Sequence, residues 1–207
     1  MRVVDVWDPG TELLVALVRH GQTAWNAEKR FLGVTDLDLD EEGERQALTL
    51  QNGLPVGFDR VYCSPLTRAR RTAAAFATQV SIVPEFAEMN QGELEGLDRA
   101  EAVARFPDFF SAWTADRGHV CAPGGESVKD VVSRTLSRLT EICSQHRPGE
   151  KIAVVSHQIV IASLTCTFRG EPLQHWSNHG IPNTAVTLVG WDGARFSVRE
   201  RGWRVAQ

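Results

Sequence analysis

Short apolar runs with the character of buried β-strands alternate along this chain with segments of helical periodicity. The clearest strand-like runs lie at 13–18 (LLVALV), 59–63 (DRVYC) and 151–155 (KIAVV). Strands that alternate with amphipathic helices are typical of α/β proteins with a parallel sheet. We therefore predict one domain over residues 1–207, folded as a three-layer α/β/α sandwich around a largely parallel central sheet.

Short-range signals indicate where the helices begin. Acidic residues follow Asp40, where the helix dipole favours them, and Ser127 with Asp130 resembles a capping box. Ser64 followed by Pro65 predicts an N-cap and the first helical residue after it. These signals predict helices that begin close to residues 40, 65 and 128.

Residues with chemically active side chains follow the three strand-like runs. Arg19 and His20 follow the first run, Arg68 lies shortly after the second, and His157 comes just after the third. The carboxyl ends of neighbouring parallel strands meet at one edge of a sheet, so we expect these four side chains to lie together. A guanidinium contacts two phosphoryl oxygens at once, and a neutral imidazole can act as a nucleophile. The pattern therefore indicates phosphate chemistry at this edge.

Composition argues against several other classes of protein. The net charge is −4, so no overall basic field attracts nucleic acid or an anionic membrane. None of the four cysteines forms a C-x-x-C pair, which favours reduced and mostly buried thiols. No apolar run has transmembrane length, and the first residues lack the apolar centre of a signal peptide. We therefore expect a cytoplasmic protein without nucleic-acid or membrane partners.

The segments around these residues resemble the histidine phosphatase superfamily, the phosphoglycerate mutase-like proteins. The matching blocks are LVRHGQTAWN (17–26), CSPLTRARRTA (63–73), AEMNQGELEG (87–96), PGGES (123–127) and VVSH (154–157). They keep the order of the family and cover most of the chain, and the resemblance implies the α/β sandwich fold.

The resemblance also implies roles for individual residues. His20 would be phosphorylated during turnover, Arg19, Arg68 and His157 would hold the phosphoryl group, and Glu88 would be the proton donor. No metal or organic cofactor is implied, because the two arginines and the second histidine supply the positive charge. Further contacts with the phosphorylated small-molecule substrate are expected from Gln22, Thr23, Asn26, Gly33 and Gln158.

Three departures from the family pattern bear on the reaction. Met89 and Asn90 stand where the mutases have a sequence that resembles E-R-H-Y-G. Leu32 stands where they favour a residue with a small hydroxyl side chain. Basic residues of the mutase type are not evident in the segment after 96, and Gln158 replaces the usual glycine after the second histidine. We therefore predict a metal-independent phosphoric monoester hydrolase of the histidine acid phosphatase type. The alternatives are a cofactor-dependent phosphoglycerate mutase and a non-catalytic phosphate-binding module on the same fold.

Other residues have more ordinary interpretations. Arg70 and Arg71 are expected at the surface, and Asn183 and Thr184 could border the site. The segment 97–125 predicts a small helical insertion over the active edge, broken at a proline. Its aromatic residues are more typical of core than of a substrate lid, and His119, His146, His175 and His179 have no metal-ligand spacing. The identity of the substrate and the oligomeric state stay open, a homodimer being one possibility.

Overall fold

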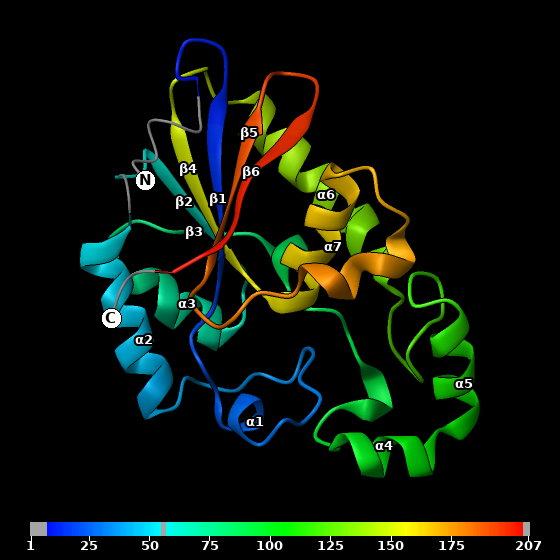
Figure 1. The fold of residues 1–207 in the computed structure, drawn as a ribbon. Coiled ribbons are helices and arrows are strands. Elements are labelled where there is room, and N and C mark those ends of the chain that lie inside the picture. Colours follow the sequence, from blue (N-terminus) through cyan, green and yellow to red (C-terminus); the bar gives the residue numbers. More distant parts are fainter. Residues whose placement is uncertain (1–7, 55–56, 205–207) are drawn as a thin grey trace.

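A computed structural model describes residues 8–54 and 57–204 of the chain, and these residues form a six-stranded sheet covered by helices on both faces (Figure 1). The strand order is β3-β2-β4-β1-β5-β6. Strands β1 to β4 run parallel, whereas β5 and β6 form the antiparallel hairpin that follows β1 at one side. The strands are β1 Leu13–Arg19, β2 Arg60–Cys63, β3 Ser81–Ile82, β4 Lys151–Ser156, β5 Val186–Trp191 and β6 Phe196–Trp203.

The helices lie in two layers, with α2 and α3 on one face of the sheet and α6 and α7 on the other (Figure 1). The α-helices are α1 Ala24–Ala27, α2 Glu41–Gly53, α3 Thr67–Ala74, α4 Arg99–Arg105, α5 Pro107–Ala115, α6 Val128–Ser144 and α7 Gln158–Phe168. Short 3-10 segments are η2 Pro84–Phe86, η3 Gly92–Leu94 and η4 Leu173–His179. The predicted α/β/α sandwich is confirmed. No helix in the described part of the chain is long and apolar enough to cross a bilayer.

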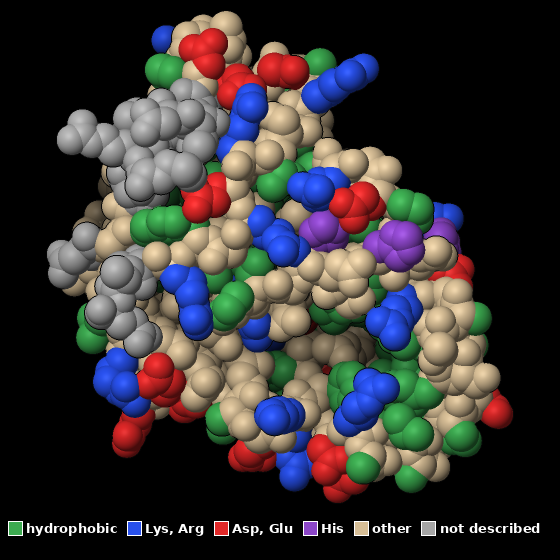
Figure 2. All heavy atoms as spheres, viewed as in Figure 1, with side chains coloured by type: hydrophobic (Ala, Val, Ile, Leu, Met, Phe, Trp, Pro, Cys, Tyr) green, Lys and Arg blue, Asp and Glu red, His purple; other side chains and the backbone are tan. Residues whose placement is uncertain are grey.

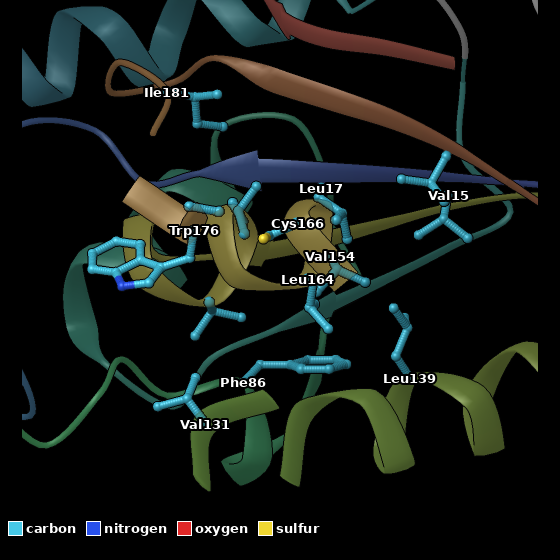
Figure 3. Close-up of a cluster of buried hydrophobic side chains, with 14 of the residues drawn as sticks. Val15, Leu17, Phe86, Val131, Leu139, Val154, Leu164, Cys166, Trp176 and Ile181 are labelled. Atoms are coloured by element: carbon cyan, nitrogen blue, oxygen red, sulfur yellow. The ribbon is translucent and has the colours of Figure 1, made fainter. Parts of the chain in front are cut away.

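The central position of β1 in the sheet explains why the sequence of this strand is apolar without interruption. Leu13, Val15 and Leu17 face the core under α6 and α7, whereas Leu14, Ala16 and Val18 face the core under α2 and α3. Figure 3 shows Val15 and Leu17 in the first of these cores with side chains of α6 and α7. Because both faces of the strand are buried, only its ends can carry polar side chains without a desolvation cost.

Two of the three predicted helix starts are confirmed and one is wrong. Asp40 Oδ1 accepts from Gly43 N at 2.7 Å as the N-cap of α2, and Ser127 with Asp130 forms a capping box at α6. Helix α3, however, begins at Thr67 rather than directly after Ser64. The Ser64 hydroxyl accepts from Leu66 N at 3.2 Å and also contacts a histidine that follows β4, so it closes a turn before the helix.

The segment 97–125 contains the expected insertion, helices α4 and α5, which meet at the Phe106–Pro107 bond. Its aromatic side chains are partly buried against the core and against one another. Trp113 also packs edge-on against Trp176 at 6.3 Å between ring centroids. These contacts confirm the core interpretation of the aromatic residues, and the insertion stands beside the carboxyl edge of the sheet (Figure 1).

Candidate active site

The ends of β1 and β4 bring two histidines together. Arg19 pairs with Ser156 in the parallel ladder, so the next residue on each strand, His20 and His157, lies at the same level. Their ring centroids are 5.0 Å apart. A cavity of about 470 Å³ opens over this edge, and Figure 2 shows the hollow with Lys and Arg side chains around its mouth. Its lining includes Arg19, His20, Asn26, Lys29, Arg30, Phe31, Leu32, Glu88, Gln91, Arg99, Gln158, Ile159, Trp176 and Asn183.

His20 has the tautomer that a nucleophile requires. Its Nδ1 lies 2.6 Å from Gly21 O, and because a carbonyl oxygen only accepts, Nδ1 must carry the proton. The lone pair is then on Nε2. Burial and the nearby charges of Arg68 and Arg19 hold the pKa of His20 well below its ordinary value, so the ring is neutral at physiological pH.

His157 is held by a contact between one of its ring nitrogens and the Ser64 side chain. The Ser64 hydroxyl accepts from Leu66 N, and the same hydroxyl lies 2.7 Å from His157 Nε2. The other ring nitrogen, Nδ1, is a buried atom that has no hydrogen-bond partner among the described residues. Desolvation is the main cause that lowers the pKa of His157. One ring nitrogen of His157 therefore has no protein partner in a ring whose centroid lies 5.0 Å from that of His20.

Two buried arginines complete the cationic part of the site. Nη1 and Nη2 of Arg68 donate to Thr35 O at 2.9 Å and Gly33 O at 2.6 Å, and the residue is fully buried. Arg19 Nη1 donates to Ile181 O at 2.6 Å. Burial lowers the pKa of Arg19 to about 10 and also lowers that of Arg68, and both remain charged at neutral pH. Nε of each guanidinium is buried and has no partner in residues 8–54 and 57–204.

Glu88 is the carboxyl group of the site. Its Oε1 accepts from Met89 N at 2.9 Å and its Oε2 from Ile159 N at 3.2 Å, and the residue is buried. Burial raises the pKa of Glu88 above its usual value, although both N–H groups and the charges of Arg68 and Arg19 oppose this shift. A raised pKa favours the protonated form, which is the form that a general acid needs.

Five of the predicted residues are therefore brought together. Arg19, His20 and Glu88 line the cavity, whereas Arg68 and His157 are buried within its wall. Within the part of the chain that the structure describes, Nε of both arginines and Nδ1 of His157 are buried without a hydrogen-bond partner. Buried polar groups are rarely left without partners, so three of them around one neutral imidazole mark a place for an anion.

Two of the additional predicted contacts line the cavity. Asn26 shares a capping box with Thr23 at the start of α1, and its Oδ1 also accepts from Asn183 Nδ2 at 3.3 Å. Both of its side-chain bonds therefore use the carbonyl oxygen, which leaves the amide hydrogens for a ligand. Gln158, the first residue of α7, lines the cavity as well. Thr23 is fully buried as the N-cap and is not on the lining.

Gln22 and Gly33 make contacts that hold the loops around the site, and the contact of each with substrate stays a prediction. Gln22 Nε2 donates to Asp40 Oδ2 at 3.1 Å, which ties the loop after β1 to the cap of α2. Gly33 receives a hydrogen bond from Arg68, and a Cβ there would lie 2.6 Å from Met89 O. Both residues therefore hold the loops around the site, and neither lines the cavity.

The turn at residues 182–185 holds the end of β1. It contains Asn183 and Thr184, which the sequence placed at the border of the site. Asn183 Nδ2 donates to His20 O at 3.0 Å, and Thr184 N donates to Arg19 O at 3.1 Å. Thr184 has a φ of 57°, a left-handed conformation that is uncommon for a residue other than glycine. Such strain is typical of functional sites, where the surrounding contacts enforce it.

The outer part of the cavity differs from the sequence-based expectation. Arg99, the first residue of α4, lines it, so the insertion does supply a basic residue. Lys29 lines it too, and neither cation has an ion pair within the described ranges. Of the residues that depart from the mutase pattern, Leu32 lies on the lining, whereas Met89 is buried in the core. The aromatic and aliphatic part of the lining consists of Phe31, Leu32, Ile159 and Trp176.

The other arginines and histidines singled out in the sequence lie elsewhere. Arg70 and Arg71 are exposed, and Arg71 pairs with Glu44 at 2.5 Å. None of the four remaining histidines lines the cavity.

A group of possible metal ligands lies outside the cavity. Cys166, Glu171 and His179 form the one set of three with suitable spacing among residues 8–54 and 57–204. His179 Nε2 bonds Glu171 Oε2 at 2.8 Å, and Arg201 Nη1 lies 3.4 Å from the other ring nitrogen. A metal-bound histidine normally donates its second N–H to an acceptor, whereas a guanidinium is a donor. The group is better explained as a hydrogen-bonded network that ties η4 to α7.

Comparison with known proteins agrees with this geometry. The family model of the histidine phosphatase superfamily (branch 1) matches residues 15–204. The chain is 35% identical over 161 residues to the metal-independent phosphoserine phosphatase of Arabidopsis thaliana, which covers 72% of this chain and 66% of that enzyme. It is 37% identical over 172 residues to a 2,3-bisphosphoglycerate-dependent phosphoglycerate mutase of Methylobacterium radiotolerans, and this match covers 77% of this chain and 80% of the mutase. The alpha-ribazole phosphatase of Shigella flexneri shares the fold with a TM-score of 0.81 and 28% identity, over 94% of this chain and 98% of that one. Because the family model spans residues 15–204, the chain belongs to the histidine phosphatase superfamily.

Proposed function

We propose that this protein is a metal-independent phosphatase that hydrolyses a phosphate monoester of a small metabolite through a phosphohistidine at His20. The observation that carries the proposal is a pair of buried N–H donors without partners among the described residues, Arg19 Nε and Arg68 Nε, near an imidazole whose Nε2 has the lone pair. A phosphoryl group carries its charge on oxygens and would satisfy these donors.

The proposed reaction has two steps. His20 Nε2 attacks phosphorus, the P–O bond to the substrate breaks, and the carboxyl proton of Glu88 passes to the leaving oxygen. Water then attacks the phosphorus of phosphohistidine, the N–P bond breaks, and the Glu88 carboxylate accepts the proton of that water. The Nδ1–H bond to Gly21 O keeps the imidazole oriented during both steps. The raised pKa of Glu88 supports a reaction of the acid phosphatase type.

The wider cavity supports a substrate with a sizeable, partly charged alcohol portion. About 470 Å³ is more room than a phosphoryl group needs, and its outer wall combines apolar side chains with Lys29 and Arg99. We infer that the leaving group presents apolar surface and a second anionic group. The names of the relatives fit phosphate esters of quite different alcohols, so the class and not the compound is proposed.

A phosphoglycerate mutase is the second candidate. Arg99 on the cavity wall favours it, because a basic residue from the insertion could bind the carboxylate of a glycerate. Relatives of the mutase type are also present. Against it, the position after Glu88 holds Met89, whose side chain is buried in the core and has no charge to offer a carboxylate.

The test measures phosphate release from a panel of phosphomonoesters in the presence of a chelator, with His20→Ala as the control. Parallel reactions contain 3-phosphoglycerate with 2,3-bisphosphoglycerate and are assayed for 2-phosphoglycerate. We expect phosphate release that survives the chelator and disappears in His20→Ala. Isomerisation without release would establish the mutase, and neither activity would leave a phosphate-binding module, the third interpretation.

A further inference from the structure

The segment that carries Glu88 has little secondary structure of its own. Glu88 lies between the short 3-10 segments η2 and η3, where the chain forms no helix or strand. An irregular backbone has no ladder of hydrogen bonds to define its position. Its placement relative to His20 must therefore come from contacts with other elements.

One side chain of α6 donates three hydrogen bonds to this segment, beside the bond from Ser156 Oγ to Phe86 O and the burial of Phe86 and Met89 in the core. Arg134 Nη1 donates to Glu85 O at 2.5 Å and to Ala87 O at 2.9 Å, and its Nη2 donates to Glu88 O at 3.0 Å. A single guanidinium thus holds three carbonyl oxygens of the segment, including that of Glu88 itself. The planar fork and permanent charge of arginine are needed for this arrangement, since an ammonium is a compact point donor.

Glu126 holds the guanidinium and the far side of the segment together. Its Oε1 accepts from Arg134 Nε at 2.8 Å, and its Oε2 accepts from Arg134 Nη2 at 3.1 Å and from Asn90 N at 2.8 Å. Glu126 N in turn donates to Asn90 O at 2.8 Å. The ion pair therefore grips the chain on both sides of Glu88, and its side chains are only 23% and 25% exposed.

We propose that Arg134 and Glu126 are positioning residues that set the place of the Glu88 carboxyl group for proton transfer. This inference rests on the proposed function. Oε1 of Glu88 is held by Met89 N, which belongs to the braced segment, whereas Oε2 is held by Ile159 N of α7. Loss of the brace would let the segment shift against α7 and move the proton donor away from the leaving oxygen.

The test compares two leaving groups. An alkyl phosphate has a poor leaving group that requires the proton from Glu88, whereas p-nitrophenolate leaves without one. For Arg134→Gln we expect kcat/KM on an alkyl phosphate from the active panel to fall roughly 10- to 100-fold, the range for a misplaced catalytic group. With p-nitrophenyl phosphate kcat/KM should stay within about threefold of wild type, since general acid catalysis contributes little there. The quantity compared is kcat/KM because it reports the first step alone, whereas kcat also includes the second step, in which Glu88 acts as a base on every substrate.

Three further variants separate positioning from simple structural damage. Arg138→Gln, one turn along α6 and paired on the surface with Glu141, should change neither rate. Glu126→Gln should show the same selective loss as Arg134→Gln. It replaces Arg134→Gln in the experiment if the Arg134→Gln variant does not fold. In a Glu88→Gln background, adding Arg134→Gln should have no further effect on the alkyl phosphate.

The outcomes are distinct. Equal losses on both substrates, or no loss on either, would refute the positioning role. An additive loss in the double variant would also refute it, because the brace would then act through something other than Glu88. Failure of the wild-type protein to release phosphate in a His20-dependent manner would instead refute the proposed function, and with it the inference.

Discussion

Replacement of Arg68 by lysine tests the phosphoryl site most directly. In the structure the guanidinium divides its donors, with Nη1 and Nη2 on the carbonyls of Thr35 and Gly33 and Nε left for a ligand. Lysine keeps the charge but has one nitrogen, which cannot span two carbonyl oxygens and a phosphoryl oxygen together. The variant therefore removes geometry while it preserves electrostatics.

The size of the effect follows from the hydrogen bonds that lysine cannot make. Removal of one preorganised donor to the transition state costs about 2.7–4 kcal/mol, or roughly 10²- to 10³-fold in kcat. Arg68 is 0% exposed, so at least one carbonyl oxygen would be without its donor in a buried place. An unsatisfied carbonyl of this kind costs about 1–3 kcal/mol of folding free energy, which lowers Tm by roughly 2–12 °C for a chain of this size.

The assay measures kcat on the best substrate of the panel together with Tm by thermal unfolding. Arg70→Lys is the matched control, because Arg70 lies on the same helix with an exposed side chain, and it should change neither quantity. A folded Arg68→Lys variant that keeps more than half of the wild-type kcat would refute the assignment of Arg68 to the phosphoryl site.

Three other predictions concern acid catalysis, stability and specificity. Burial raises the pKa of Glu88, so the activity of the wild-type protein should fall as pH rises through that pKa. In a pH profile of kcat/KM, the Glu88→Gln variant should lack this loss of activity at alkaline pH. Because the folded-state pKa is raised, stability is lost as pH rises through it, so the Tm of Glu88→Gln should rise relative to that of wild type as pH increases. A difference in Tm that does not change with pH would contradict the assignment. Asp40→Ala removes the N-cap of α2 and should cost about 1 kcal/mol, seen as a Tm lower by roughly 2–4 °C, with Asp38→Ala as an exposed comparison. Arg99→Gln should raise KM at least several-fold for substrates with a second anionic group and leave KM for p-nitrophenyl phosphate unchanged, and equal shifts for both would exclude a subsite at Arg99.

Much of the fold and the centre of the site could be predicted from the sequence. The strands were visible because both faces of β1 are buried, so every position from Leu13 to Val18 is apolar. The catalytic candidates were visible because parallel strands place their carboxyl ends at one edge, which turns the order of segments into proximity. The capping box at Ser127 was readable because its hydrogen bonds span three residues.

The remaining features depend on contacts between segments that are far apart in the chain. Ser64 looked like a helix cap, but its hydroxyl turns to His157, 93 residues away. The carbonyl of Gly33 receives a hydrogen bond from Arg68, 35 residues away, which no local pattern indicates. Arg134 belongs to no motif, yet it holds carbonyl groups 46 to 49 residues earlier. Local patterns determined the strands, the helix caps and the edge where the chemistry occurs, because hydrophobic periodicity and capping act over a few residues. Only the tertiary structure decided which donor faces which acceptor, because each side chain has several possible partners and packing selects one.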